Sequence, residues 1–386
     1  MSVQTLIDVM SAIAPLALAE PWDRVGLLAG DAKAECSGPV LLTIDLTERV
    51  MDEAVEMGAS MIIAYHPPIW EPLTRVTTST PRQRVILRAL RAGIAIYSPH
   101  TALDAVSGGV ADWLCEGLGG SDPLGAESPR KIRGDCRALT PASGVPSTQQ
   151  VKIVTFVPAS AAEELRNAMA SAGAGRIGAY EVCSFTSPGI GTFLAGEGAK
   201  PRVGGAGQIE TVTELRLEMV CSKAALALAL DTLRRFHPYE EPAIDVYDLI
   251  AKPQRGVGAG RRLVLDQPVT VVELAQRLKL WTKRDRVRYA LCGAADTPVT
   301  FVGVCPGAGS SLSKSARGEG CEVFVTGEMS HHDVMGALHA GMSVILGNHT
   351  STERGYLPRL AEQIRGALPL AAVVISAADS DPLVTV

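Results

Sequence analysis

The stretch "VLLTIDLTERVMDEAVEMGASMIIAYH", residues 40–66, decides the fold class of this chain. The apolar run 40–45 is typical of a buried strand, 47–58 of an amphipathic helix that ends at a glycine, and 60–66 of a second buried strand. The alternation of strands and helices continues to about residue 120. Such alternation indicates βαβ units with a largely parallel sheet, so we expect an α/β fold. Functional groups gather at the carboxyl ends of such strands, where His66 and His100 lie.

The composition limits the size and class of the protein. A chain of 386 residues predicts two or three domains. The net charge of -5 argues against nucleic acid or an anionic membrane as the main partner, because either would require a basic face. The eight cysteines include no C-x-x-C pair, which is typical of reduced thiols. Since no stretch is long and apolar enough to span a membrane, we expect a soluble, cytoplasmic protein.

Changes of pattern along the chain predict an insertion. Residues 121–150 are rich in Gly, Ser and Pro and are expected to form a linker. The following segment, 150–250, has the approximate order βαββαβ of a ferredoxin-like domain. Strands and helices alternate again after residue 251, apart from "GVGAGRR" (256–262), which we expect to be a turn. The prediction is an N-terminal α/β lobe over 1–125, an inserted domain over 150–250 and a C-terminal α/β lobe over 251–386.

Two segments of the chain resemble each other. Aligned at a constant offset, residues 51–66 and 334–349 share five identities in 16 positions, the last of which pairs His66 with His349. Both segments also follow the order helix, glycine, strand and terminal histidine. We therefore infer two related lobes, each presenting a histidine at a strand end.

Histidines and carboxylates near these strand ends are candidate metal ligands. Four of the seven histidines lie at or beside strand-end turns: His66, His100, His332 and His349. In "HTALD" Asp104 follows a histidine by four residues, and in "HTSTE" Glu353 does so, which places each pair on one face if the segment is helical. Imidazole with carboxylate is a ligand set for zinc, manganese or iron, and a carboxylate such as Glu353 can bridge two ions. The sequence predicts a site for one or two divalent ions where the two lobes meet.

Structural interpretations of the same residues stay open at this point. "TSTE" (350–353) and "SHHD" (330–333) both match the capping box, in which the acidic residue serves only to cap a helix. We expect one continuous helix over "HTSTERGYLPRLAEQIRG" (349–366). His66 or His100, taken alone, could be a hydrogen-bonded turn residue. The convergence of four such groups on one end of two related lobes favours the metal site.

A glycine-rich loop, "CPGAGSS" (305–311), lies between a predicted strand and a helix. The backbone N–H groups of such a loop can hold an anion, which makes Gly307, Gly309 and Ser310 candidate substrate-binding residues. The loop lacks the lysine of a Walker motif.

Several blocks of the chain resemble the Nif-three-like family, whose members are often described as GTP cyclohydrolase 1 type 2 homologues. The blocks are "PWDRVGLLAG", "TIDLTERVMDEAVEMGASMIIAYHPPIW", "IYSPHTALDAVSGGVADWL", "FVTGEMSHHD" and "VILGNHTSTERGYL". The segments "AGAGRIGAYEVCSF", "GTFLAGEGAKP" and "HPYEEPAIDVY" resemble the inserted domain of the longer members. The resemblance implies two intertwined α/β lobes with mixed sheets, a ferredoxin-like insertion similar to PII and CutA, and a homohexamer with a dinuclear metal site.

The resemblance also implies roles for individual residues. The metal ligands would be His66, Asp104, His349 and Glu353, the last touching both ions. The first family block often carries two consecutive histidines, and the first of them is Tyr65 in this chain.

A neutral phenol is a poor ligand at pH 7 because its pKa is near 10, so we expect the second ion to be weakly held or absent. His100 and His332 match family positions, and with Tyr65 they are the candidate catalytic residues that support the metal or move protons.

These observations predict a metal-dependent hydrolase acting on a small, phosphorylated or nucleotide-like heterocyclic substrate, with GTP ring opening as one candidate reaction. The alternatives are a non-catalytic metal-binding scaffold that recruits a protein partner, and a regulatory protein whose insertion senses a small ligand.

Overall fold

The computed structural model describes residues 1–120, 132 and 134–384. They form two compact units, Met1–Ala142 with Gln254–Val386, and Ser143–Pro253. The chain passes from one unit to the other within β5 (Asp135–Gly144) and β10 (Lys252–Thr270).

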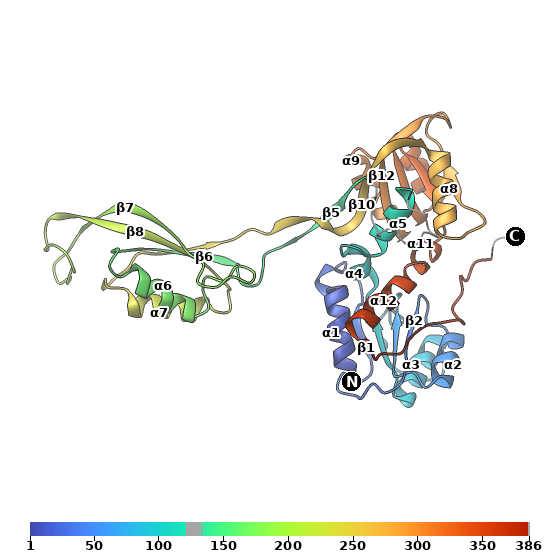
Figure 1. Cartoon of the computed structure of the whole chain (residues 1–386), viewed down its shortest axis with the longest axis horizontal. Coiled ribbons are helices and arrows are strands. Elements are labelled where there is room, and N and C mark those ends of the chain that lie inside the picture. The colour runs from blue at the N-terminus through green and yellow to red at the C-terminus, as the bar shows by residue number, and fades with distance from the viewer. Residues whose placement is uncertain (121–131, 133, 385–386) are drawn as a thin grey trace. The chain divides into compact units, whose positions relative to one another are not determined.

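A five-stranded sheet forms one half of the first unit (Figure 1). Its order is β1-β4-β3-β2-β15, in which only β1 runs antiparallel to its neighbour. The strands are β1 (Gly26–Ala29), β2 (Val40–Thr43), β3 (Met61–Ala64), β4 (Ala95–Ser98) and β15 (Val373–Ile375). The accompanying helices are α1 (Val3–Ile13), α2 (Glu48–Glu56), α3 (Pro81–Ala92), α4 (His100–Ala105), α5 (Val110–Leu118) and α12 (Leu357–Ala367). Helices α2 and α3 cover one face while α1 and α12 cover the other, so β2, β3 and β4 are buried throughout.

A six-stranded mixed sheet forms the other half, in the order β11-β14-β13-β12-β10-β5. Strands β12, β13 and β14 are parallel, while β10 runs antiparallel to β12 and β11 runs antiparallel to β14. The new strands are β11 (Arg288–Ala290), β12 (Pro298–Ala308), β13 (Val323–Glu328) and β14 (Ser343–Leu346). The new helices are α8 (Val271–Trp281), α9 (Ser313–Gly318), α10 (His331–His339) and α11 (Ser351–Arg354). Short 3₁₀ turns span Leu16–Leu18 and Ser310–Leu312.

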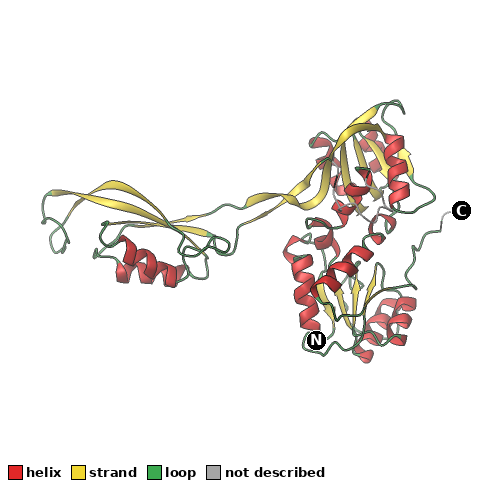
Figure 2. Cartoon of the chain, viewed as in Figure 1, coloured by secondary structure: helices red, strands yellow, loops and turns green. Residues whose placement is uncertain are grey.

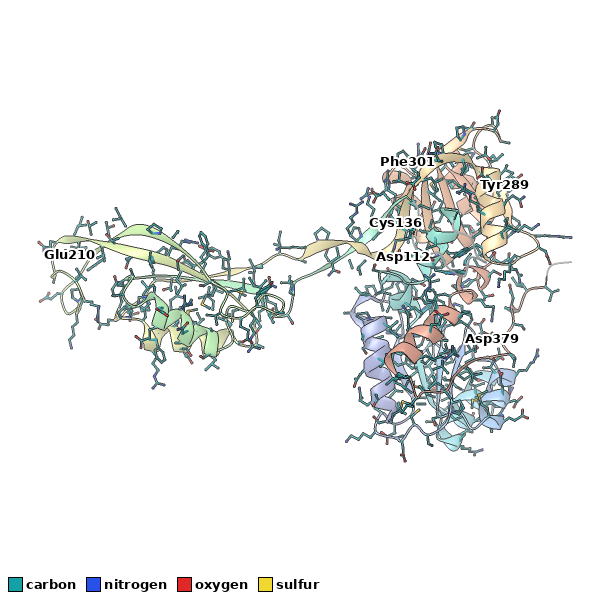
Figure 3. The ribbon with its side chains drawn as sticks, in the orientation of Figure 1. Asp112, Cys136, Glu210, Tyr289, Phe301 and Asp379 are labelled. Atoms are coloured by element: carbon teal, nitrogen blue, oxygen red, sulfur yellow. The ribbon has the colours of Figure 1, made fainter. Side chains whose placement is uncertain are left out.

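One continuous hydrophobic core joins the two sheets of the first unit. At its edge the guanidinium of Arg261, in β10, is fully buried and pairs with Asp112 of α5, labelled in Figure 3. The same guanidinium donates to the carbonyls of Ala105 and Val106, at the end of α4. A single arginine of β10 therefore fixes both the end of α4 and the first turn of α5.

The two sheets repeat one arrangement of helix and strand. Helices α2 and α10 occupy equivalent positions in the alignment of residues 51–66 with 334–349, and each precedes a parallel strand. The predicted pairing of His66 with His349 therefore corresponds to a repeated structural unit.

The structure corrects three sequence expectations in the first unit. The C-terminal part of the expected linker, 135–144, is strand β5, and the expected turn 256–262 lies within β10, next to it in the sheet. A Cβ atom on Gly258 would lie 2.2 Å from the carbonyl oxygen of Thr140, so the glycine serves the close approach of two strands. The expected single helix over 349–366 is two helices, α11 and α12, which separate at Gly355. The rest of the expected linker includes 121–131, which lies outside the described residues.

The second unit contains a four-stranded antiparallel sheet with two helices on one side (Figure 2). Its elements are β6 (Val151–Val157), α6 (Ala162–Ser171), β7 (Phe185–Leu194), β8 (Ile209–Cys221), α7 (Leu226–Phe236) and β9 (Ile244–Asp248). The strand order is β7-β8-β6-β9. Its core lies between α6, α7 and the alternate residues of β6 and β8 that face them.

No helix among the described residues is both long enough and apolar enough to cross a bilayer.

Candidate metal centre

Two strand ends and one short helix bring three predicted ligands together. His66 follows β3, His349 follows β14, and Glu353 lies in α11. One ligand atom from each side chain can be chosen so that all three lie within 4.8 Å of one another. These three predicted ligands, which come from both halves of the first unit, therefore lie together as the sequence predicted.

A carboxylate fixes the orientation of each imidazole. Nδ1 of His66 lies 2.9 Å from Oδ1 of Asp45, and Nδ1 of His349 lies 2.9 Å from Oε1 of Glu328. Asp45 follows β2 and Glu328 ends β13, so both carboxylates also come from carboxyl ends of parallel strands. This pairing leaves Nε2 of each ring as the ligand atom, which is the usual arrangement around a protein-bound metal.

The carboxylate of Glu353 lies between the two Nε2 atoms. Its Oε2 is 3.4 Å from Nε2 of His66, and its Oε1 is 3.4 Å from Nε2 of His349. Within the described part of the chain, Nε2 of His66 and Oε2 of Glu353 are buried and have no hydrogen-bond partner. Buried polar atoms are rarely left unpaired, and these two belong to residue types that bind divalent cations. The site therefore fits a metal ion.

The electrostatic potential at the site is strongly negative. Burial alone would lower the pKa of His66, but the hydrogen bond with Asp45 and the negative charges of Glu353 and Asp45 outweigh it and raise this pKa to about 10. Burial likewise opposes the charged form of Asp45, yet His66 and the positive charge of Arg354 hold its pKa below the usual value. Without an ion, His66 carries a proton at neutral pH, because the site attracts positive charge.

The capping-box interpretation of "TSTE" is not realised. Thr350 has a helical backbone and makes no side-chain cap, and its hydroxyl has no hydrogen-bond partner among the described residues. Glu353 faces the histidines instead of the helix start. In "SHHD" the cap is present, since the hydroxyl of Ser330 accepts from the backbone N–H of Asp333.

The glycine-rich loop lies against the metal site. A Cβ atom on Gly307 would lie 2.4 Å from Oε1 of Glu353 and 3.2 Å from Nε2 of His349. The backbone N–H groups of Gly307 and Gly309 donate to the hydroxyls of Thr352 and Thr326, at 2.9 and 3.0 Å. These two donors are therefore engaged inside the protein, and the absence of a side chain at Gly307 gives Glu353 its room.

The carboxylate of Asp104 lies outside the group of three and is held by Tyr65. The Tyr65 hydroxyl donates to Oδ1 of Asp104 at 2.5 Å. Burial, together with the charges of Asp104 and Glu353, raises the pKa of Tyr65 well above its ordinary value, so the phenol stays protonated. Burial also raises the pKa of Asp104 well above its ordinary value. Tyr65 acts here as a donor to a predicted metal ligand.

His100 lies at the centre of an aromatic cluster beside His66. Its Nδ1 is 2.8 Å from Oδ1 of Asp23, whose other oxygen accepts from the backbone N–H of Thr101. The His100 ring centroid lies 5.4 to 6.1 Å from the centroids of four aromatic side chains: Trp22, Tyr65, His66 and Trp70. Trp22 and Trp70 are about half exposed. The cluster offers flat apolar surface next to a histidine of fixed orientation.

The remaining predicted residues lie at the first turn of α10 and at the nearby 3₁₀ turn. His332 is exposed, and its ring centroid lies 5.7 Å from that of His331. No hydrogen bond, ion pair or ring contact within the described residues joins His332 to His66, His349 or Glu353. Ser310 lies at the start of its 3₁₀ turn.

The C-terminal segment contacts residues adjacent to Asp45 and Glu353. Asp379, labelled in Figure 3, accepts from the backbone N–H of Ile44 at 2.7 Å and from the guanidinium of Arg354 at 2.6 and 3.2 Å. Ile44 precedes Asp45, and Arg354 follows Glu353. One carboxylate therefore connects the two segments that carry the site's acidic groups.

Comparison with known proteins agrees with this architecture. The family model DUF34/NIF3 (NGG1p interacting factor 3) matches residues 1–382. The chain belongs to the DUF34/NIF3 family.

The "GTP cyclohydrolase 1 type 2 homolog" of Halalkalibacterium halodurans is 32% identical over 382 residues, which is 98% of this chain and 97% of that protein. The protein of the same name from Bacillus subtilis is 35% identical over 346 residues, or 90% and 87% of the two chains. The crystal structure of a Bacillus cereus protein related to NIF3 has a TM-score of 0.68 and 31% identity, covering 100% of this chain and 99% of that one. The resemblance seen in the sequence blocks is thus confirmed.

Sequence reasoning missed three carboxylates of this NIF3-family site: Asp23, Asp45 and Glu328. Asp45 and Glu328 each end an apolar run, in "VLLTID" and "EVFVTGE", as His66 does. The rule that groups at strand ends converge would have found them. Asp23 follows no strand, and its proximity to His100 depends on tertiary structure.

Proposed function

We propose that this NIF3-family protein is a divalent-metal-dependent hydrolase acting on a small, phosphorylated or nucleotide-like heterocyclic substrate. The observation that carries the proposal is the buried pair of unpartnered atoms, Nε2 of His66 and Oε2 of Glu353, beside two imidazoles whose Nδ1 atoms are fixed by carboxylates. Zinc, iron and manganese suit this ligand set. When bound, such an ion supplies Lewis-acid chemistry and lowers the pKa of a water ligand.

The residues would divide the work as follows. His66, Asp104, His349 and Glu353 hold one or two ions. Tyr65 keeps one oxygen of Asp104 engaged at 2.5 Å, which favours one tightly held ion and a weak second one.

Proton transfer would fall to His100 and His332. Asp23 fixes Nδ1 of His100, which leaves Nε2 free to exchange a proton with substrate. His332 is exposed at the start of α10 and would act only if the substrate reaches that turn. Of the predicted loop residues, Ser310 would contact an anionic group of the substrate, because the backbone N–H groups of Gly307 and Gly309 are already bonded inside the protein.

The proposal extends to the organisation of the protein. We propose that residues 1–125 and 251–386 form two intertwined lobes of a cytoplasmic homohexamer, in which α12 and β15 of the second segment pack with the first sheet, and that 150–250 is a ferredoxin-like domain. The element order βαββαβ and the strand order β7-β8-β6-β9 support the last point.

Metal content and hydrolysis test the function together. Elemental analysis of gently purified protein should find zinc, iron or manganese, and Glu353→Ala should lose most of it. Glu56→Ala, an exposed residue at the end of α2, is the matched control and should keep the metal. The metal-loaded protein should hydrolyse members of a panel of phosphoesters and nucleotides, and GTP ring opening would release formate. Full metal binding with no turnover on the whole panel would refute the hydrolase.

The second candidate is a non-catalytic metal-binding scaffold that recruits a protein partner. The exposed apolar side chains of the β7–β8 hairpin, among them Phe185, Ile190 and Ile209, favour it because they are suited to an interface. A scaffold predicts that metal removal changes the size of the oligomer, measured by light scattering, while the substrate panel stays inactive.

A further inference from the structure

Two of the four tryptophans, Trp22 and Trp70, are exposed and lie against each other beside His100. They are 55% and 46% exposed, and their ring centroids are 5.6 Å apart. The other two, Trp113 and Trp281, also contact each other, but they pack within or against the core of the first unit. Because an indole gains much stability from leaving water, a pair of indoles left exposed at one place indicates a binding surface.

The chain fixes the position of both indoles before a ligand binds. A proline precedes Trp22, and Asp23, which follows it, is buried and bonded to Nδ1 of His100. Trp70 follows two prolines and Ile69, and Ile69 packs against the core under α2 and α3. Proline restricts the backbone, so a ligand that binds here orders little of the chain.

Each indole also contacts the imidazole of His100. The distances between ring centroids are 6.1 Å for Trp22 and 5.7 Å for Trp70, and the ring planes are close to perpendicular, at 74° and 72°. The ring of His100 in turn lies 5.4 Å from that of His66. A flat ring stacked on either indole therefore lies next to the imidazole that we assign to proton transfer, and one side chain away from a proposed metal ligand.

The polar partners of this aromatic cluster are carboxylates. His100 is bonded to Asp23, and the Tyr65 hydroxyl is bonded to Asp104. Among the described residues, no lysine or arginine forms a hydrogen bond, ion pair or cation–π contact with His100 or with either indole. A phosphate bound on the indoles would lie near the carboxylate of Asp23 without a cation to balance it, whereas a neutral or protonated heterocycle avoids this repulsion.

We propose that Trp22 and Trp70 bind the aromatic heterocycle of the substrate, and that this ring, not the phosphate, is the part held beside His100. Because the indole planes make an angle of 55°, a flat ring that stacks on one indole meets the other obliquely, near its edge. The inference rests on the proposed hydrolase for the class of its substrate. Binding of the ring can nevertheless be measured without turnover.

Calorimetry on the full-length protein with manganese present tests which part of the substrate is recognised. The probes are GMP, AMP and nicotinamide mononucleotide, which place three different flat rings on one ribose phosphate, and ribose 5-phosphate, which has no aromatic ring. At least one of the three nucleotides should bind, and ribose 5-phosphate should bind at least about tenfold more weakly. If no nucleotide binds at about 10 mM, or if ribose 5-phosphate binds as tightly as the best nucleotide, the proposal is wrong.

Variants of the two indoles locate the ring. Trp22→Ala and Trp70→Ala should each weaken binding of the best nucleotide by roughly 5- to 150-fold, the usual effect of losing one stacking partner. Trp22→Phe and Trp70→Phe keep an aromatic face and should restore most of the affinity. Tyr289→Ala is the matched control, because Tyr289, labelled in Figure 3, is 47% exposed on another strand of the first unit; it should bind as the wild type does. Circular dichroism and elemental analysis should show that every variant keeps its fold and its metal.

The outcomes separate this inference from the hydrolase itself. Nucleotide binding that depends on the indoles, without any turnover, would support the ring site and refute the enzyme. Turnover with wild-type kcat/KM in Trp22→Ala and Trp70→Ala would support the enzyme and overturn the ring site. A smaller oligomer in these variants, measured by light scattering, would assign the indoles to a subunit interface and would also overturn the proposal.

Discussion

Replacing Gly307 with alanine should weaken metal binding at the site with only a modest loss of folding stability. Gly307 has φ of +60°, in the left-handed region, and its missing Cβ would lie 2.4 Å from Oε1 of Glu353. Glu353 is only 3% exposed, and its carboxylate lies between His66 and His349. The added methyl group must therefore displace a carboxylate that has little free space.

Two effects of different size are expected from this substitution. The left-handed backbone costs about 1–2 kcal/mol of folding stability for any residue with a Cβ. Oε1 of Glu353 must also move by about 1 Å to restore an ordinary contact distance, and disturbances of this kind at metal ligands lower affinity by about 10- to 100-fold.

The matched control for this variant is Gly58→Ala. Gly58 has φ of +64°, but a Cβ atom there would meet nothing within 4 Å. Urea denaturation of both variants should show a similar loss of stability, while calorimetric titration with zinc or manganese should show weakened binding only for Gly307→Ala. Wild-type metal affinity in Gly307→Ala, or an equal loss in Gly58→Ala, would refute the steric argument.

Further predictions concern the proton on His66, the phenol of Tyr65 and the buried ion pair. Because the pKa of His66 is about 10 without metal, a metal ion must displace a proton from this residue. The apparent affinity for zinc or manganese should therefore rise about tenfold per pH unit from pH 7 towards 10, and calorimetry in buffers of different ionisation enthalpy should detect about one proton released per ion. An affinity that does not change with pH would contradict this. Tyr65→His should raise the metal content from one ion per chain to two by elemental analysis, and two ions in both proteins would show that the phenol does not weaken the second site. Asp112→Ala should cost about 3–5 kcal/mol in denaturant unfolding, because it leaves the fully buried guanidinium of Arg261 without its partner; a loss below 1 kcal/mol would show that the pair is dispensable.

The histidines of the site could be found from sequence because their positions follow a rule of parallel sheets. His66 and His349 end repeated helix–strand segments, and carboxyl ends of parallel strands share one edge of a sheet. The position of Glu353 followed from its spacing to His349. The same rule extends to Asp45 and Glu328, which were missed because the search began from histidines rather than from strand ends.

Other features depended on contacts between distant segments. The proline and the glycine of 135–144 favour a loop, and only pairing with β10 makes this stretch a strand. The local sequence does not show that Thr350 makes no helix cap. The cap is absent because Glu353, which would complete it, faces His66 and His349. The donation from Tyr65 to Asp104 likewise joins positions 65 and 104, whose contact no spacing predicts.

The C-terminal segment has a consequence for how the protein is made. Strand β15 completes the sheet that presents His66, and Asp379 joins the backbone before Asp45 to the residue after Glu353. Because translation delivers these parts last, a nascent chain has His66 long before it has the groups that surround it. In the proposed metal centre, an ion would therefore find its complete set of ligands only after the segments with His349, Glu353 and Asp379 have been synthesised and have packed against the first sheet.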